Sequence, residues 1–229
     1  MWMLYLTSEN NRRQTEKKME NCQDCIDNKA HLERKRLARK DYHIDKKLSE
    51  NKENRENLFF SLDLQKVRML PEIPGVKAAV FTQRIAADNE SFSPIGEKCG
   101  DSIGVIWHQG VASRNDEDIV SCWVKFVREY VPKYVKTLTV WMDNCGPQNK
   151  NWTIFPGLIS IVNSKRNNLQ AITMKFFEVG HTYMSADSFH HRVEKAVKQQ
   201  GYLYDFGDYE KCINAAGRAL VMEPKDFLL

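Results

Sequence analysis

The stretch from Thr137 to Asn151 constrains this chain most, because it joins a strand to a helix through an acidic turn. β-Branched and aromatic residues fill positions 137–142 and predict a strand that stops at Asp143. A polar turn containing glycine and proline follows, and an apolar run at helical spacing begins at Trp152. In α/β sheets, ligands and metals collect at the carboxyl ends of strands. We therefore expect a functional site around Asp143.

Two further acids lie where they can join Asp143. Asp63 interrupts a second strand-like run at positions 59–67, and Asp187 follows the last predicted strand. Carboxylates that converge on one point repel each other unless a cation neutralises them, and hard oxygen ligands favour Mg²⁺ or Mn²⁺. We predict that these three acids bind two such ions and act as the catalytic residues.

Other roles remain open for these acids. Asp63 can pair with a basic residue at a strand edge. Asp187 lies two residues after the expected N-cap Ser185, where the helix dipole favours an acid without any metal. Two residues compete with it for the third position: Glu178, which ends the preceding strand, and Glu194, about 10 Å further along the helix axis. A position at the start of the helix favours Asp187.

Polar residues crowd the turn after Asp143. Their amides and one ammonium group can contact the phosphates and base edges of a nucleic acid. The same residue types also serve as turn and helix-capping groups, which leaves both roles open. The candidates for nucleic-acid contact are Asn144, Gln148, Asn149, Lys150 and, after the last strand, His181.

The predicted elements follow the order β-β-β-α-β-α-β-α. Three successive strands favour an antiparallel meander, and the later alternation favours parallel strands covered by helices. A polar loop is expected at 88–101, and Trp107, Trp141 and Trp152 are expected in the core. The predicted strands are 59–67, 77–87, 102–108, 137–143 and 171–177, and the predicted helices are 113–131, 151–163 and 185–199, with a short helical pattern at 209–219.

Residues 1–56 differ from the rest because Asn, Lys, Arg, Glu and Gln dominate them. We expect a charged, mostly helical arm that protrudes from a domain at residues 57–229, since its apolar stripe is too thin for full burial. Within the arm, Cys22 and Cys25 form half of a zinc site. No second pair completes the motif nearby, so zinc is the less favoured interpretation and ordinary thiols are the favoured one.

Composition narrows the class of protein. Hydrophobic residues make up 42% of the chain, charged residues 28%, and the net charge is +4. No apolar run approaches the roughly 20 residues that cross a bilayer, and Met1–Leu6 is too short for a signal peptide. The six cysteines are scattered, which argues against a disulfide scaffold. We expect an intracellular protein in a reducing compartment, nuclear or cytoplasmic, with no membrane partner.

Three motifs of this chain resemble a family of transposon-encoded domains of unknown function. That family has a ribonuclease H-like core and is related to DDE transposases and retroviral integrases. The motifs are Leu62-Asp-Leu-Gln65, the string from Trp141 to Asn151, and Gly180-His-Thr182 followed by Asp187. The resemblance covers residues 57–215, and the charged segment with its Cys-x-x-Cys pair resembles the region upstream of the family's core.

The chain departs from the family pattern in two ways. Pro147 stands where a small residue, usually Gly, is expected, which puts the conformation of that turn in doubt. The arm also begins abruptly, so we expect that the N-terminal DNA-binding part of full-length members is missing.

The resemblance implies a ribonuclease H-like mixed sheet flanked by helices, with DNA as the partner. Water or a DNA 3′-hydroxyl would attack a phosphodiester held across two divalent cations, with Asp63, Asp143 and Asp187 as metal ligands. The alternative is a non-catalytic descendant that keeps the fold and binds nucleic acid or protein partners. Assembly into a homo-oligomer is compatible with either function.

Overall fold

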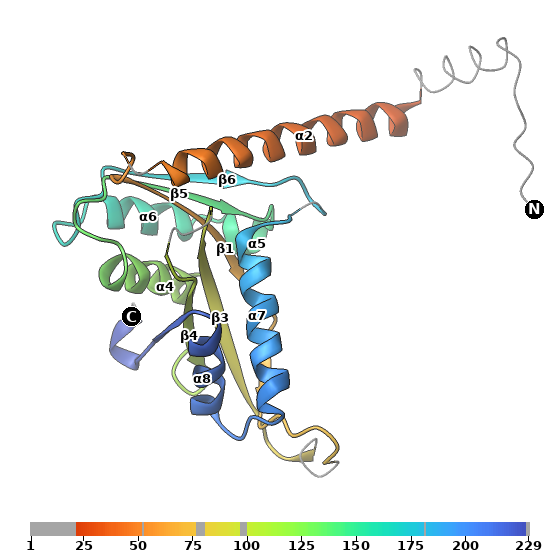
Figure 1. Cartoon of the computed structure of the whole chain (residues 1–229), viewed down its shortest axis with the longest axis vertical. Helices are drawn as coiled ribbons and strands as arrows, with labels where there is room; N and C mark the ends of the chain where they lie inside the picture. The colour runs from red at the N-terminus through yellow and green to blue at the C-terminus, as the bar shows by residue number, and fades with distance from the viewer. Residues whose placement is uncertain (1–21, 52, 77–80, 97–99, 181, 228–229) are drawn as a thin grey trace, which may run out of the picture.

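The computed structural model describes residues 22–51, 53–76, 81–96, 100–180 and 182–227. Within these ranges the chain forms one seven-stranded mixed sheet with helices on both faces (Figure 1). The strands are β1 (Asn57–Leu64), β2 (Arg68–Leu70), β3 (Ile85–Pro94), β4 (Ile103–His108), β5 (Thr137–Met142), β6 (Ala171–Phe176) and β7 (Arg218–Val221). The helices are α2 (Gln23–Glu50), α4 (Asp116–Glu129), α5 (Gly146–Asn149), α6 (Ile154–Val162), α7 (Ser185–Gln200), α8 (Phe206–Ala216) and the 3-10 turn η1 (Pro224–Asp226).

The order of the strands in the sheet is β6-β5-β1-β3-β4-β7, and β2 pairs with β3 beside this path. β1, β3 and β4 form an antiparallel meander. β5 is parallel to β1, β6 is parallel to β5, and β7 is parallel to β4. The predicted α/β class, with a mixed sheet flanked by helices, is therefore confirmed.

Each face of the sheet packs against different helices. On one face, alternate residues of β1, β3, β4 and β5 meet α4 and α6 in the largest core cluster, which includes Phe92, Trp107 and Trp123. On the other face, α7 and α8 pack against β3 and β4 around Phe189 and Ile213. The two faces are called the α4 face and the α7 face below.

Two predicted boundaries in the meander are wrong. The second strand was expected at 77–87 with a polar loop at 88–101, but β3 runs from Ile85 to Pro94. Residues 77–80 lie outside the described residues. The polar run was mistaken for a loop because its side chains are buried and some of them find partners in other parts of the chain. Asn89, for example, donates to Gln65 at 2.9 Å.

Two short strands were not predicted. β2 lies between the strands predicted at 59–67 and 77–87. β7 follows α8, which ends at Ala216 instead of continuing to 219. Both strands have three or four residues, and neither is long enough to show an alternating pattern in the sequence.

Helix α2 lies where the charged arm was expected. Its last third does not protrude, because Tyr42 is buried against Trp141 and Phe177 on the sheet. The buried Asp45 accepts hydrogen bonds from the indole of Trp141 and the ammonium of Lys175, both at 2.7 Å. The first part of the helix extends beyond the sheet (Figure 1). The prediction of a protruding arm is therefore wrong for the end of the helix that leads into β1.

One of the three tryptophans expected in the core is outside it. Trp107 and Trp141 are buried, whereas Trp152 is 89% exposed. α6 begins at Ile154 and buries Ile154, Leu158 and Ile161. Trp152 precedes the helix and is not aligned with this buried stripe.

None of the helices in the described ranges combines the length and the apolar character that crossing a lipid bilayer requires.

Candidate functional site

Asp63 and Asp143 lie side by side at the carboxyl ends of two parallel strands. β1 and β5 are neighbours, and Ser61 stands opposite Trp141 in their register. Continuing this register by two residues, past the end of β5 at Met142, brings Asp63 and Asp143 together. Because side chains alternate along a strand, both project from the α7 face. The site expected at this end of the sheet therefore has two acids on adjacent strands.

The pKa of Asp63 reflects the other two acids. This pKa is raised to about 7, first by burial and then by the negative charges of Asp143 and Asp187, in that order of importance. Arg114 and the backbone N–H of Leu64 oppose the rise only in part. The Asp63 side chain is still 26% exposed, so a proton or a cation from solvent can reach it. The three predicted acids thus form one electrostatically coupled cluster.

The turn after β5 holds Asp143 in place. Oδ1 of Asp143 accepts hydrogen bonds from the side-chain amide of Asn149 at 2.6 Å and from the backbone N–H of Cys145 at 3.2 Å. Asn149 is only 3% exposed. It therefore supports the carboxylate from inside the protein and exposes little surface for the predicted contact with a nucleic acid. Pro147 is accommodated near the start of α5, where a missing N–H breaks no helical hydrogen bond.

The three candidates for the third acid have different partners. Glu178 is bound by two residues of α2, His31 at 2.9 Å and Arg34 at 3.1 Å. Glu194 accepts from Gln65 at 3.1 Å and pairs with Arg68. Neither of these two acids is among the groups that shift the pKa of Asp63.

Asp187 lies in the first turn of α7, where the helix dipole stabilises its charge. Its Oδ2 accepts the backbone N–H of Met184 at 2.8 Å. The N-cap is thus Met184 and not the expected Ser185, whose hydroxyl instead contacts Ser61 on β1 at 2.6 Å. This contact docks the start of α7 on β1, and the placement favours Asp187 as the third acid.

His190 lies beside Asp63, although the sequence alone did not single it out. Its Nδ1 lies 3.5 Å from Oδ2 of Asp63, and its Nε2 lies 2.8 Å from the hydroxyl of Ser91. Burial lowers the pKa of His190 to about 4, so the ring is neutral at pH 7 and the contact with Asp63 is not a salt bridge. The spacing of three residues between Asp187 and His190 places both on one helix face, and this spacing was the available signal.

Of the remaining candidates for nucleic-acid contact, some lie at the surface near Asp143 and others lie outside the described residues. Lys150 is exposed, donates to the side chain of Asn144 and lies 4.2 Å from the centre of the Phe176 ring. Both residues are beside Asp143 at the surface. The side chain of Gln148, and His181 altogether, lie outside the described residues.

Glu90 is an acid that the sequence analysis did not single out. It is fully buried on β3, and neither of its carboxyl oxygens has a hydrogen-bond partner among the described residues. Burial, followed by the charge of Asp63, raises its pKa well above the usual value. There was no reason to select Glu90 from the sequence, because it lies within the predicted loop at 88–101 and a loop residue is not expected to be buried.

The described residues contain no group of three or more His, Cys, Asp or Glu side chains already arranged to hold a metal ion. The acids do have room for one. Among the described residues, Oδ2 of Asp143 and Oδ1 of Asp187 have no hydrogen-bond partner, so each carboxylate keeps a free oxygen. Cys22 and Cys25, considered for zinc, are free thiols at the start of α2.

A family model described as a domain of unknown function (DUF7869) matches residues 105–203. The matched segment contains Asp143 and Asp187, whereas Asp63 precedes it. No curated protein and no solved structure matches the chain. Over residues 105–203, the chain is therefore similar to a domain family that has no assigned function.

Proposed function

We propose that residues 57–229 form a ribonuclease H-like, transposase-derived domain that cleaves or joins DNA phosphodiesters with two divalent metal ions. The strand order supports the ribonuclease H-like assignment. A central β1 has an antiparallel meander on one side and parallel strands β5 and β6 on the other. α7 then follows β6 and carries the third acid in its first turn.

The observation that carries the proposal is the mutual repulsion within the carboxylate cluster. Asp63, Asp143 and Asp187 come from three separate segments, yet the charges of the last two raise the pKa of the first. Such an arrangement costs stability unless a positive charge relieves it. Mg²⁺ or Mn²⁺ would be held by these three residues. When bound, two such ions supply stabilisation of the attacking and leaving oxygens of a phosphodiester.

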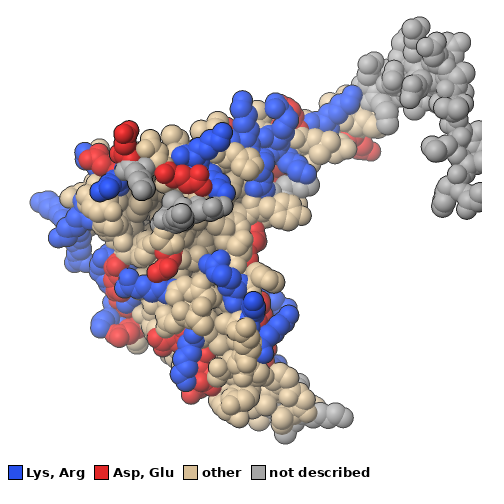
Figure 2. Space-filling view, viewed as in Figure 1, with Lys and Arg blue, Asp and Glu red and all other residues tan. Residues whose placement is uncertain are grey.

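The surroundings of the cluster suit a nucleic acid. Figure 2 shows basic side chains gathered over α2 and a hollow between α2 and the start of α7. Lys150 and Asn144 are at the surface beside Asp143. Lysine side chains near the metal ligands would bind phosphates of the DNA backbone without reading its sequence.

Metal binding is the first test. Titration with Mn²⁺ is expected to raise the melting temperature of the protein and to give saturable heat in calorimetry. Asp143→Asn keeps the shape of the side chain and removes its charge, so it should abolish both signals. Glu117→Gln, which removes an exposed acid at the start of α4, is the matched control and should leave them unchanged. Equal Mn²⁺ affinity in the Asp143→Asn protein would refute the metal site.

A second candidate function is a non-catalytic domain that binds nucleic acid or a protein partner. The observation favouring it is that Asp143 and Asp187 each already cap a local turn or helix end, a role that needs no metal. In that case DNA binding would not depend on Mn²⁺ or on Asp143, and no nicking would be detected with either Mg²⁺ or Mn²⁺. Metal-dependent nicking that Asp143→Asn abolishes would exclude this second function.

A further inference from the structure

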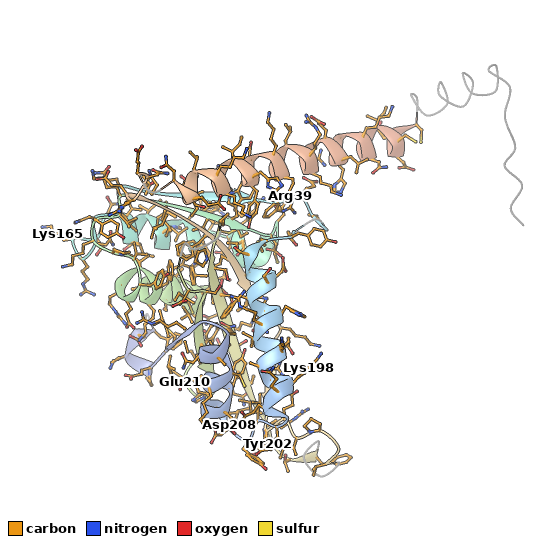
Figure 3. All side chains as sticks on the ribbon, viewed as in Figure 1. Arg39, Lys165, Lys198, Tyr202, Asp208 and Glu210 are labelled. Atoms are coloured by element: carbon orange, nitrogen blue, oxygen red, sulfur yellow. The ribbon has the colours of Figure 1, made fainter. Side chains whose placement is uncertain are left out.

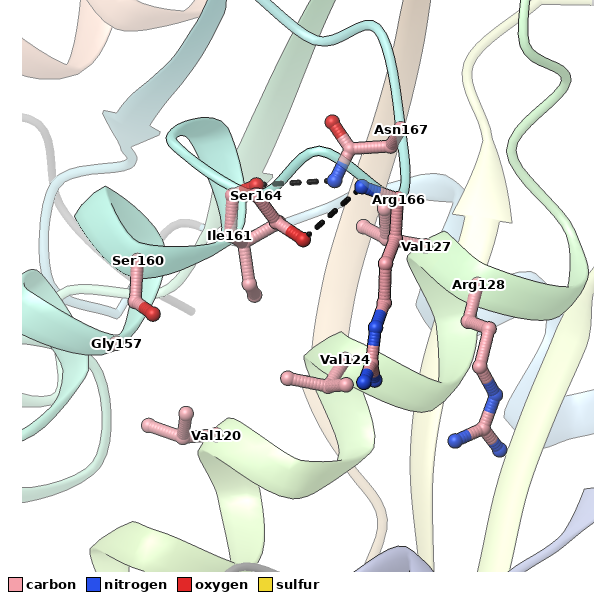
Figure 4. Close-up of a pocket in the computed structure, with 10 residues that line it drawn as sticks. All are labelled: Val120, Val124, Val127, Arg128, Gly157, Ser160, Ile161, Ser164, Arg166 and Asn167. Atoms are coloured by element: carbon pink, nitrogen blue, oxygen red, sulfur yellow. Dashed lines mark hydrogen bonds between the residues drawn. The ribbon is translucent and has the colours of Figure 1, made fainter.

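A cavity of about 220 Å³ opens between α4 and α6, on the α4 face of the sheet and away from the acids (Figure 4). Its wall is apolar and includes Val120, Val124, Val127 and Ile161. Two arginines, Arg128 from α4 and Arg166 from the loop after α6, complete the lining. The cavity thus joins an apolar interior to a basic rim.

The geometry of the cavity is fixed by the close packing of the two helices. A Cβ atom on Gly157 of α6 would lie only 2.6 Å from Cγ1 of Val120, so glycine allows α6 to touch α4 at this point. Beyond the contact, the chain leaves α6 in a loop that holds the cavity open. The side-chain amide of Asn167 donates to the carbonyl of Ile161 at 2.9 Å, and the N–H of Arg166 donates to the hydroxyl of Ser164 at 3.2 Å (Figure 4).

The two arginines differ in their partners. Arg128 is neutralised by Glu129 at 2.8 Å and Asp226 at 2.6 Å. Arg166 forms no ion pair with any Asp or Glu of the described residues. In Figure 4 its side chain extends from the loop toward Val124 and ends there, with the Arg128 side chain further to the right. The rim therefore presents a guanidinium group whose charge is not balanced by the protein, and its planar donors match a carboxylate.

We propose that this cavity binds a small organic anion, a carboxylate attached to one aromatic ring or to a short alkyl chain. The carboxylate pairs with Arg166 at the rim, and the apolar part displaces water from the valine-lined wall. The volume sets the size of the ligand. An engineered cavity of about 150 Å³ in another protein binds benzene, and drug-sized ligands need about 300–1,000 Å³. At about 220 Å³, this cavity suits a ligand slightly larger than benzene.

The site is independent of the proposed function. It lies on the α4 face, whereas the carboxylate cluster lies on the α7 face, and the two share no residue. Binding here would remain even if the acids bound no metal.

3-Phenylpropionate is a suitable probe for the full chain. We expect saturable binding with a Kd below about 1 mM, measured by calorimetry and by saturation-transfer NMR. 3-Phenylpropanol, which has the same shape without the charge, should bind at least about tenfold more weakly. No saturable binding of the carboxylate, or equal binding of the alcohol, would overturn the proposal.

Two variants test the charge and the space separately. Arg166→Gln keeps most of the side-chain length and should weaken binding by about tenfold. Ser160→Phe places a ring at the edge of the cavity and should block the ligand while leaving both arginines in place. Lys165→Gln is the matched control, because Lys165 points outward from the same loop (Figure 3), and it should change nothing. Unchanged affinity in Arg166→Gln, or an equal loss in Lys165→Gln, would rule out the assigned site.

Discussion

Asp63 and Glu90 are neighbours in the sheet, yet their side chains project from opposite faces of it into different surroundings. In the ladder between β1 and β3, Asp63 pairs with Ser91 and the next residue, Leu64, pairs with Glu90. Because side chains alternate, Asp63 projects from the α7 face and Glu90 from the α4 face. Asp63 meets His190 and two other acids, whereas Glu90 meets the apolar core beside Cys122.

Burial alone does not make an acid a candidate metal ligand. Both acids have raised pKa values, and burial is the largest cause for each. Glu90 is 0% exposed and has no described hydrogen-bond partner, so burial disfavours its charged form and a ligand from solvent does not reach it. Asp63 remains partly exposed, and the negative charges of Asp143 and Asp187 act on it, so a cation can replace its proton. Access and neighbouring charge, and not the size of the pKa shift, distinguish the candidate metal ligand.

The largest expected effect is on DNA cleavage. Asp63→Asn should lower the rate of Mn²⁺-dependent nicking of supercoiled DNA by orders of magnitude, because it removes a charge that holds the metal. Glu90→Gln should retain activity close to that of the parent. Rates from gel assays at saturating Mn²⁺ would measure both. Equal losses in the two variants would show that the two acids are not functionally distinct.

Stability as a function of pH should separate the same two acids. The folded-state pKa of Asp63 is raised to about 7. Its charge therefore costs nothing below about pH 4, and the cost grows between pH 4 and pH 7 and is constant above pH 7. In the absence of divalent metal, Asp63→Asn should increase the free energy of unfolding by about 2–4 kcal/mol at pH 8 and by almost nothing at pH 4. Urea unfolding across this range would measure the gain.

Glu90→Gln provides the contrast. Burial raises the pKa of Glu90 well above its usual value, so its charged form also costs stability as the pH rises above that usual value. The gain from Glu90→Gln should therefore also grow with pH, but along a different curve from that of Asp63→Asn, because Glu90 is fully buried whereas Asp63 is partly exposed. Identical curves for the two variants would mean that the two environments are alike.

His190 should produce a smaller effect of the opposite sign. Its pKa falls to about 4 in the folded state, so between pH 6.5 and pH 4 the unfolded chain binds more protons and acid destabilises the fold. In His190→Gln, the loss of stability over this range should be smaller by about 1–3 kcal/mol. The constant cost of losing the contact with Ser91 does not change the slope, so the slope is the quantity to compare. An unaltered slope would contradict the burial of the ring.

The smallest expected effect comes from Arg114, a cation that acts on both acids. It lowers the pKa of Asp63 and of Glu90, and its guanidinium lies 3.7 Å from Asp88. Because Arg114 is partly exposed, Arg114→Gln should cost less than about 1 kcal/mol. Carbon-detected NMR titration should show a small rise in the pKa of Asp63. A fall would show that Arg114 does not stabilise the charged cluster.

Sequence reasoning placed the carboxylate cluster because its signals were local. Asp63 and Asp143 each follow several apolar residues in a strand-like run, and Asp187 begins a helix with a clear apolar stripe. Such patterns can be recognised in the sequence without knowledge of the rest of the fold. The alternation of strands and helices in the second half of the chain predicted parallel strands, and β5 and β6 are parallel to their neighbours.

The missed features depend on distant partners. The polar residues of β3 look like a loop until Gln65 and His190 are known to bind Asn89 and Ser91. Asn149 looks like a surface amide until its bond to Asp143 is seen. The packing of α2 depends on Asp45, which is buried only because Trp141 and Lys175 bind it. Long-range hydrogen bonds of this kind leave no periodic signal in the sequence.

The central position of β1 also affects how the protein is made. Asn57 of β1 pairs with Thr137 of β5, 80 positions later in the chain. At a synthesis rate of about 5–20 residues per second, β5 leaves the ribosome roughly 4–16 seconds after β1. During this interval one edge of β1, which includes Phe59, Phe60 and Leu62, has no partner strand. An apolar strand with a free edge is prone to pair with other chains, so chaperone protection during synthesis would matter most before β5 appears.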